Sequence, residues 1–304
     1  MIKKILTVVV GSLLAVQLAG AQVDTGSSTG AQALSEARSA PTSPSAPATE
    51  TVDVVAVSSG KNIKEVVVVE EPEKWWSVNA STGWDSLYMF RGVNILGNGH
   101  GLYWLGGDVG ITPWANGTFT AGIWYGVGTG VDYQELNVFA NYTHSFGPLD
   151  ATFGWIYYYY PTLDHISQNE LFWALAYNAE VGSVTITPSA TYYLNVGPDV
   201  NNGGWTQPAA SYLLFRVDAS IPVYQEIVSL DPWVGYGLNF DFNSRNDGSF
   251  FNGGNNFELG LSLPVQITSW FSVSGYVAYS YQWQELVNTD ENTWWAGASA
   301  SFSF

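Results

Sequence analysis

The chain of 304 residues contains no cysteine. This absence excludes a disulfide framework, thiolate catalysis and zinc-finger chemistry. It does not fix the compartment, because a secreted protein can fold without disulfides. Basic residues are also scarce: Lys and Arg together number 9 against 26 Asp and Glu, so the net charge is -17. A nucleic-acid-binding protein needs a basic surface to meet the phosphates, and the sequence therefore predicts no nucleic-acid partner.

From Trp75 to the C-terminus the chain has no lysine, and its only arginines are Arg91, Arg216 and Arg245. A soluble β-sandwich buries one face of each sheet but usually exposes Lys and Arg on the other. The scarcity of basic residues therefore favours a surface that meets lipid. A secreted sandwich is the alternative.

Residues that could carry catalysis or hold a metal are few. His165 and Ser167 have a spacing similar to that of outer-membrane phospholipases, but they fall in an expected loop with no identifiable third partner or oxyanion hole. The Asp-, Asn- and Gly-rich stretch 241–256 places Arg245 where a calcium loop needs an oxygen ligand. We therefore predict no enzymatic activity, no metal site and no cofactor.

Long apolar runs are confined to the N-terminus. There Lys3 and Lys4 precede an apolar segment that ends at Ala19-Gly20-Ala21. A charged start, a short apolar core and small residues at the cleavage point are typical of a secretory signal peptide, so residues 1–21 are predicted to be removed during export. An uncleaved membrane anchor is the alternative, and the short apolar core favours the signal peptide.

Two segments separate the signal peptide from Trp75. Residues 22–50 are rich in Ala, Ser, Thr, Gly and Pro and cannot bury enough apolar surface to become ordered, which predicts a disordered tether. In residues 51–74 the runs VDVVAV and EVVVV flank SSGKN, a pattern that predicts either a hairpin or a sticky extension in the periplasm. The sequence indicates no function for this extension.

Aromatic residues make up 15% of the chain, and 32 residues are glycine. From residue 75 onward, apolar and polar residues alternate in twelve segments of roughly ten residues each. These segments lie near 76–90, 100–114, 117–127, 133–146, 150–160, 170–181, 184–195, 209–222, 228–242, 255–267, 270–283 and 293–304. Short connections alternate with longer polar ones, except for a short one near 128–132. This pattern predicts an all-β fold, a transmembrane antiparallel β-barrel of about 12 strands over residues 75–304 with both termini on the periplasmic side.

The last segment, TWWAGASASFSF, shows the alternation clearly. Phe304, Phe302 and Trp294 share one face with three alanines, while serines, Gly297 and Trp295 occupy the other. A period of two residues means a strand with one apolar and one polar face. Uncharged outward faces flanked by aromatic residues fit a lipid belt, so we expect the apolar face to contact lipid and the serine face to line the interior.

The stretch STGWDSLYMFRGVNILGNGH resembles the first strand and loop of the TorF-type porin family. That family carries a Y-x-F-R-G signature at the top of strand one, which Tyr88, Phe90, Arg91 and Gly92 match. The rest of the resemblance is architectural and covers about residues 75–304. It implies a porin of the bacterial outer membrane and does not specify a substrate.

The C-terminus carries a second resemblance. A final aromatic residue preceded by alternating apolar positions looks like the signal that the outer-membrane barrel assembly machinery reads. Phe302 and Phe304 match that signal, with the more distant Trp294. The resemblance implies this machinery as a partner during biogenesis.

The inward positions of the predicted strands are often small, which leaves room for water because a barrel of about 12 strands is wider than one of eight. The polar or charged inward positions are Asp85, Asp108, Glu135, Asn137, Asn141, Glu170, Glu180, Arg216, Asp218, Asp231, Asn239, Asp241 and Glu258. Many of them lie near strand ends, whereas Arg216, Asp218 and Glu258 lie deeper and could line a constriction. The pore-lining candidates are Asp108, Glu180, Arg216, Asp218 and Glu258.

An open lumen with this excess of carboxylates favours cations. We therefore predict a porin-like protein for passive diffusion of small hydrophilic solutes or ions. If Arg216, Asp218 and Glu258 neutralise one another in a network that plugs the barrel, the prediction becomes a non-conducting structural or surface-binding barrel. Both alternatives place the protein in the lipid of the bacterial outer membrane.

Overall fold

The computed structural model describes residues 74–114, 116–163, 166–198, 209–225 and 227–304. The predicted signal peptide, the predicted tether and residues 51–73 of the predicted extension lie outside this part of the chain. Within the described ranges, no helix is long and apolar enough to cross a membrane.

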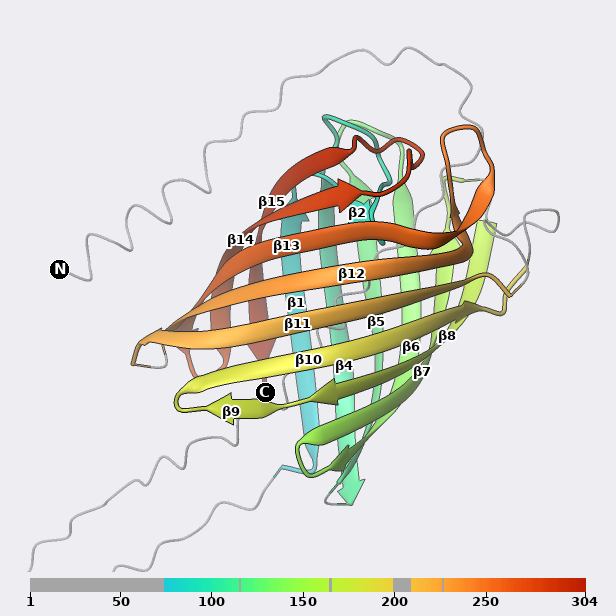
Figure 1. Ribbon diagram of the computed structural model, residues 1–304. Helices are drawn as coiled ribbons and strands as arrows, with labels where there is room; N and C mark the ends of the chain where they lie inside the picture. Colours follow the sequence, from blue (N-terminus) through green and yellow to red (C-terminus); the bar gives the residue numbers. More distant parts are fainter. Residues whose placement is uncertain (1–73, 115, 164–165, 199–208, 226) are drawn as a thin grey trace, which may run out of the picture.

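The described residues form one antiparallel sheet of 13 strands that closes on itself as a barrel (Figure 1). One of these strands, β9 (Ala179–Val181), is a short piece beside β10, so twelve strands make up the wall. The twelve are β1 (Trp76–Asp85), β4 (Leu102–Trp114), β5 (Gly117–Gly128), β6 (Gln134–Phe146), β7 (Leu149–Tyr160), β8 (Ile166–Tyr177), β10 (Val184–Asn195), β11 (Ser211–Tyr224), β12 (Val228–Ser244), β13 (Phe250–Thr268), β14 (Phe271–Gln282) and β15 (Asn292–Ser303). The predicted all-β barrel and its twelve strands are confirmed.

The barrel closes where the first wall strand pairs with the last. The register runs from Asn79 opposite Ser303 to Asp85 opposite Gly297. Phe304 extends this seam, because its N–H donates to the carbonyl oxygen of Val78 at 3.0 Å and its carbonyl oxygen accepts from the Val78 N–H at 3.2 Å. Closure leaves no sheet edge, which is the condition for a β-structure surrounded by lipid.

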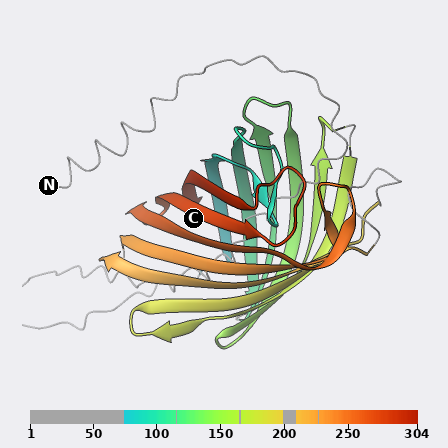
Figure 2. The same cartoon turned by 45° about the horizontal axis from the view of Figure 1, so that its top comes forward.

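The connections are sorted by length between the two ends of the barrel (Figures 1 and 2). The turn end carries the connections 115–116, 147–148, 182–183, 225–227 and 269–270, together with the first and last residues of the barrel. The loop end carries the connections 86–101, 129–133, 161–165, 196–210, 245–249 and 283–291. The predicted asymmetry is confirmed, but 129–133 is not an exception. The connections 161–165 and 245–249 are equally short, because β8, β12 and β13 extend beyond the predicted strands into the predicted loops.

Alternate side chains of each wall strand face outward, and most of them are apolar. On β15, Trp294 is 63% exposed, whereas Ser299 and Ser301 on the other face are partly buried. Further exposed apolar side chains on other strands include Tyr103, Leu105, Val109, Ile123, Phe153, Leu175, Phe215, Leu259, Leu263 and Val277. A belt of large apolar side chains around the whole barrel is suited to lipid and not to water. The predicted division of the last strand into an outward apolar and an inward serine face is confirmed.

Large aromatic side chains of the inner wall lie over glycines of the neighbouring strand. The pairs include Trp233 over Gly260, Tyr276 over Gly297 and Trp104 over Gly83. A Cβ atom at any of these glycines would overlap the ring above it. Glycine therefore lets each ring lie along the wall instead of projecting into the lumen, which explains why the inner face combines large rings with very small residues.

Gly260→Ala is expected to push the Trp233 ring off the wall and to lower the free energy of unfolding by about 1–3 kcal/mol, the usual cost of overpacking a filled site. Denaturant unfolding of the refolded barrel measures this loss. Gly275→Ala is the matched control, because the nearest atom to its new Cβ would be the carbonyl oxygen of Gly297 at 3.9 Å. If the two variants lost the same free energy of unfolding, overlap with the Trp233 ring would not be the cause of the loss.

The first predicted strand, near 76–90, is longer than the observed one. β1 ends at Asp85, and the chain then turns into the barrel. There β2 (Met89–Phe90) and β3 (Val93–Asn94) pair with each other and not with the wall. The alternation that predicted a longer wall strand therefore belongs to a separate inward hairpin.

A two-residue turn forms the tip of this hairpin. Phe90 pairs with Val93, and between them Arg91 and Gly92 have φ angles of 45° and 83°. Positive φ at both central residues is the type I′ geometry of tight hairpins, and Gly92 adopts it without a steric cost. Tyr88, Phe90, Arg91 and Gly92 thus lie inside the barrel and not at the top of strand one, because the chain reverses at Arg91-Gly92.

Candidate functional site

The inward hairpin fills the lumen at the loop end. We call residues 86–96 the plug hairpin. Its side chains Tyr88, Phe90, Val93 and Ile95 are at most 4% exposed. They belong to one apolar cluster with residues of the wall and of the other loops, namely Leu102, Tyr133, Tyr158, Tyr160, Tyr193, Tyr212, Phe242, Phe251 and Leu286. At this level the plug hairpin and the wall are packed like a protein core.

One buried ion pair joins the plug hairpin to the wall strand β8. Arg91 Nη1 donates to Glu170 Oε2 at 2.7 Å and Arg91 Nη2 donates to Glu170 Oε1 at 2.6 Å, and both side chains are 0% exposed. The guanidinium also lies over the rings of Tyr193, at 3.8 Å, and Phe242, at 4.6 Å. Removing one partner of such a pair leaves a buried charge without compensation, so the two residues depend on each other.

The turn of the plug hairpin is also held through its backbone. The carbonyl oxygen of Arg91 accepts hydrogen bonds from Asn255 Nδ2 at 2.7 Å and from Asn243 Nδ2 at 3.0 Å. On the following strand, the Asn94 N–H donates to Thr289 Oγ1 at 2.7 Å. Residues from β12, β13 and the β14–β15 connection therefore hold the hairpin from several sides.

A second buried carboxylate anchors the base of the hairpin. Glu135, on β6, is 0% exposed and accepts hydrogen bonds from Tyr88 Oη at 2.7 Å, Tyr133 Oη at 2.6 Å and Asn137 Nδ2 at 2.8 Å. Among these donors, Tyr88 belongs to the plug hairpin. The hairpin is thus bound to the barrel wall at two points along its length, through Tyr88 and through Arg91.

Sequence reasoning placed Glu135 and Glu170 among the inward residues but did not single them out as partners of the signature. The sequence indicates these two partners only indirectly. An arginine that enters an aromatic-rich interior needs a carboxylate, and inward carboxylates near the loop ends of strands are the available partners. The signature residues and these two carboxylates form one structural unit.

The lumen toward the turn end is different in character, and we call this part the vestibule. Its inward side chains include Asp85, Asp108, Arg216, Asp218, Asp231, Glu258 and the serines Ser81, Ser272, Ser274, Ser299 and Ser301. These side chains are partly exposed, in contrast to the buried plug hairpin. Small and polar inward residues in a barrel of this width leave space for water.

Three of the predicted pore-lining residues form one cluster on the vestibule wall. Arg216 Nη2 lies 2.7 Å from Asp218 Oδ1, and Arg216 Nη1 lies 3.8 Å from Glu258 Oε1. Arg216 and Glu258 both pair with Gly235 of the strand between them. The charges therefore neutralise one another along one side of the wall and do not form a ring across the lumen.

The other two candidates lie elsewhere. Asp108, on β4, is six strands from β11 in either direction around the wall and so faces the Arg216 cluster, and its Oδ1 accepts from Asn79 Nδ2 at 2.9 Å. Glu180, on β9, is exposed and lies beside the 182–183 turn at the barrel rim. Asp108 thus shares the vestibule with the cluster, whereas Glu180 stands at its entrance.

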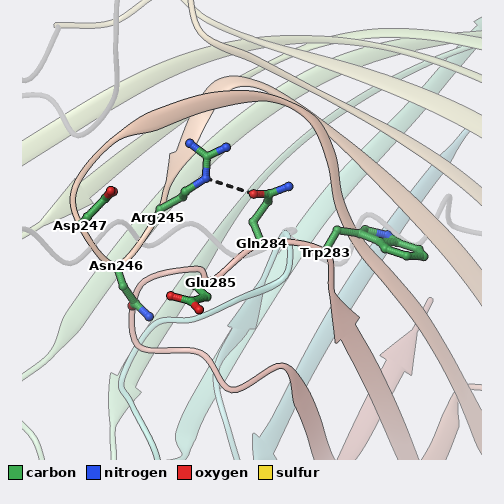
Figure 3. A pocket seen from close by; sticks show the side chains of 6 residues that line it. All are labelled: Arg245, Asn246, Asp247, Trp283, Gln284 and Glu285. Atoms are coloured by element: carbon green, nitrogen blue, oxygen red, sulfur yellow. Dashed lines mark hydrogen bonds between the residues drawn. The ribbon is translucent and has the colours of Figure 1, made fainter.

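A pocket of about 320 Å³ lies between two connections at the loop end (Figure 3). It is lined by Arg245, Asn246, Asp247, Trp283, Gln284 and Glu285. Arg245 Nε donates to Gln284 Oε1 at 3.0 Å, which ties the two loops together, and hydrogen bonds from Ser249 lower the pKa of the Asp247 carboxyl below its ordinary value. The Trp283 side chain points away from the other five, so the pocket is a polar junction between loops.

The predicted absence of catalysis and metal binding stays a prediction. His165 lies outside the described residues, whereas Ser167 lies on the wall strand β8 and not in the expected loop. Among the residues that the structure describes, no group of three or more His, Asp or Glu side chains could hold a metal ion.

No family model matches the sequence, and no curated protein matches it. Membership of the TorF-type family therefore stays a prediction. Among solved structures, an outer-membrane channel from Pseudomonas putida F1 is similar, with a TM-score of 0.51 and 10% identity over 77% of this chain and 99% of that one. At this identity the likeness shows a shared barrel fold.

Two other outer-membrane barrels have lower TM-scores. The translocator domain of the autotransporter NalP from Neisseria meningitidis has a TM-score of 0.47 and 17% identity, over 77% of this chain and 90% of that one. The NanC porin has a TM-score of 0.47 and 11% identity, over 74% of this chain and 98% of that one.

Proposed function

We propose that this protein is a channel of the bacterial outer membrane through which small hydrophilic solutes or ions diffuse passively, with a preference for cations. The vestibule carries this proposal. Toward the turn end the lumen is lined by small, polar and charged side chains that are partly exposed, which a barrel with a purely structural role would not need. The plug hairpin then limits passage at the loop end, so the channel conducts when the hairpin moves from the lumen.

The outer-membrane location rests on the outward face. A closed β-barrel with a continuous apolar belt is the β-structure that can cross a bilayer. With short turns and both barrel termini at one end, the turn end faces the periplasm and the loop end faces outward. The vestibule therefore opens to the periplasm, and the plug hairpin closes the outer side.

A non-conducting structural or surface-binding barrel is the second candidate. The fully buried Arg91–Glu170 pair favours it, because a hairpin held in this way resembles a permanent core element. Single-channel recording of the refolded barrel in a planar bilayer separates the two candidates. Stable current steps support the channel, whereas silence in both the native barrel and a barrel without the plug hairpin would overturn it.

The preference for cations rests on the vestibule charges. Its described carboxylates, Asp85, Asp108, Asp218, Asp231 and Glu258, outnumber the guanidinium of Arg216. Such a lining attracts cations and repels anions at close range.

Glu258→Gln is expected to move the reversal potential under a salt gradient toward zero, because it removes one carboxylate and leaves the Arg216 charge less compensated. The matched control is Glu180→Gln at the exposed rim, where solvent screens the charge, and its effect is expected to be smaller. A larger effect at the rim than in the vestibule would contradict this account.

The assembly machinery is proposed as a biogenesis partner through the C-terminal aromatic residues. Phe304 also closes the seam with its backbone, and its ring stacks on Trp270 at 6.1 Å. Phe304→Ala keeps the backbone pairing and removes the ring. We expect several-fold less folded barrel in the membrane fraction of cells but almost unchanged refolding in detergent. If refolding in detergent fell as much as the yield of folded barrel in cells, Phe304 would have a structural role alone.

A further inference from the structure

An arc of aromatic rings runs along the vestibule wall. Trp233 and Tyr276 have ring centroids 6.1 Å apart, the Tyr276 hydroxyl donates to Asp85 Oδ1 at 2.5 Å, and Trp104 Nε1 donates to Asp85 Oδ2 at 3.0 Å. The arc spans the neighbouring strands from β12 to β4 across the seam of the barrel. Two of the three rings are therefore fixed by one carboxylate, and the third lies beside Tyr276 on the same continuous part of the wall.

Each ring of the arc lies on the inward side of the wall and is partly exposed. Each of them covers a glycine of the neighbouring strand, at Gly260, Gly297 or Gly83. Trp233, Tyr276 and Trp104 are all partly exposed, and Trp104 also packs against the apolar cluster around the plug hairpin. Partly exposed rings that are fixed along the wall in this way are suited to contact a flat ligand.

Charged groups lie beside the arc. The Arg216 guanidinium is 5.2 Å from the Trp233 ring centroid, and the same guanidinium pairs with Asp218 and Glu258. The carboxylates accept hydrogen bonds, and the guanidinium donates them. Ring faces next to a few polar groups make up the usual lining of a small-molecule site.

This combination selects a chemical class of solute. A cyclic sugar presents an apolar C–H face to a ring and hydroxyl groups at its edge, which can donate to carboxylates and accept from a guanidinium. An anionic solute is repelled by the excess of carboxylates in the vestibule. An acyclic polyol has the hydroxyl groups but no flat C–H face.

We propose that the vestibule arc of Trp233, Tyr276 and Trp104 binds neutral cyclic sugars. The inference deepens the proposed channel function by naming a solute class for the same lumen. Binding needs only the vestibule, which opens at the turn end, and does not require the plug hairpin to move. Binding and passage can therefore be measured separately.

Saturation-transfer NMR on the refolded full-length protein measures the binding with three probes: glucose, its acyclic alcohol sorbitol and the anion glucuronate. We expect transfer to glucose and much less to the other two. Trp233→Leu should reduce the transfer to glucose about fivefold, the loss expected for one aromatic contact. Trp294→Leu is the matched control, because that tryptophan is 63% exposed on the outward face, and it should leave the transfer unchanged.

Equal transfer to glucose and sorbitol, or an unchanged signal in Trp233→Leu, would overturn the inference. If Trp233→Leu does not refold, Trp104→Leu tests the same arc from its other end. Swelling of liposomes that contain the protein tests passage independently. Passage of glucose and sorbitol at equal rates, without binding, would retain the channel and reject the sugar site, whereas binding without passage of any solute would retain the site and reject the channel.

Discussion

Arg91→Met is expected to lower the free energy of unfolding of the barrel by about 3–5 kcal/mol, because it leaves the Glu170 carboxylate buried without its partner. The charge cannot reach water at this site, since both side chains are 0% exposed and the surrounding rings exclude solvent. Denaturant unfolding of the refolded barrel, followed by tryptophan fluorescence, measures the loss.

The double variant Arg91→Met/Glu170→Leu isolates the ion pair from the packing around it. Replacing both partners with apolar side chains removes the unpaired charge, so most of the lost stability should return. Arg245→Met is the matched control: this arginine lies at the loop-end pocket and bonds Gln284 and Ser249, so little change is expected. If the single and double Arg91 variants lose the same stability, the pair does not hold the hairpin.

Replacing residues 86–101 by Asn-Gly is expected to convert the barrel into a constitutively open channel with several-fold higher conductance. Asp85 and Leu102 face each other in the β1–β4 register, so a two-residue type I′ turn can join them without disturbing the wall. The change removes the plug hairpin, including the ring of Tyr88 and the charge of Arg91, from a lumen wider than that of an eight-stranded barrel. Planar-bilayer recording measures the conductance.

A second loop provides the control for this replacement. Ser244 pairs with Phe250, so Asn-Gly can replace residues 245–249 in the same way. That change shortens a loop at the surface and leaves the plug hairpin in place, and conductance should stay at the native level. A hairpin-free barrel that folds but does not conduct would show that the vestibule does not lead through the membrane.

The wall of the barrel could be predicted from the sequence because its cause is local. In β13 and β15 every second side chain meets the outside, and the alternation of Leu259, Leu261 and Leu263 with small or polar residues records this directly. The lengths of the connections indicate which end of the barrel carries the turns and which carries the loops. Neither feature depends on contacts between distant residues.

The predicted first strand was wrong beyond Asp85 for the same reason. Residues 87–90 (LYMF) are an unbroken apolar run directly after the alternating residues of β1, so nothing in them marks the end of the strand. The turn at Arg91-Gly92 lacks the Asn-Gly or Asp-Gly pair that signals a type I′ hairpin most strongly. Local pattern therefore could not separate a longer wall strand from a hairpin folded into the lumen.

The candidate charges show the same limit. The alternation predicted that Arg216, Asp218 and Glu258 face inward, and it left open whether they line a constriction or neutralise one another. That they line one side of the wall follows from the register across Gly235, which the pattern of a single strand does not contain.

The sequence by itself determined the barrel, its twelve strands, its two ends and its apolar belt, since each arises from the two-residue period of a strand and the composition of its turns. Only the tertiary structure decided that the plug hairpin, which carries the signature residues, fills the lumen. Its position depends on Glu170, which lies 79 residues from Arg91, and on a barrel wide enough to hold a hairpin. A buried charge needs its partner in space, and that partner is fixed by strand order and register, not by neighbouring sequence.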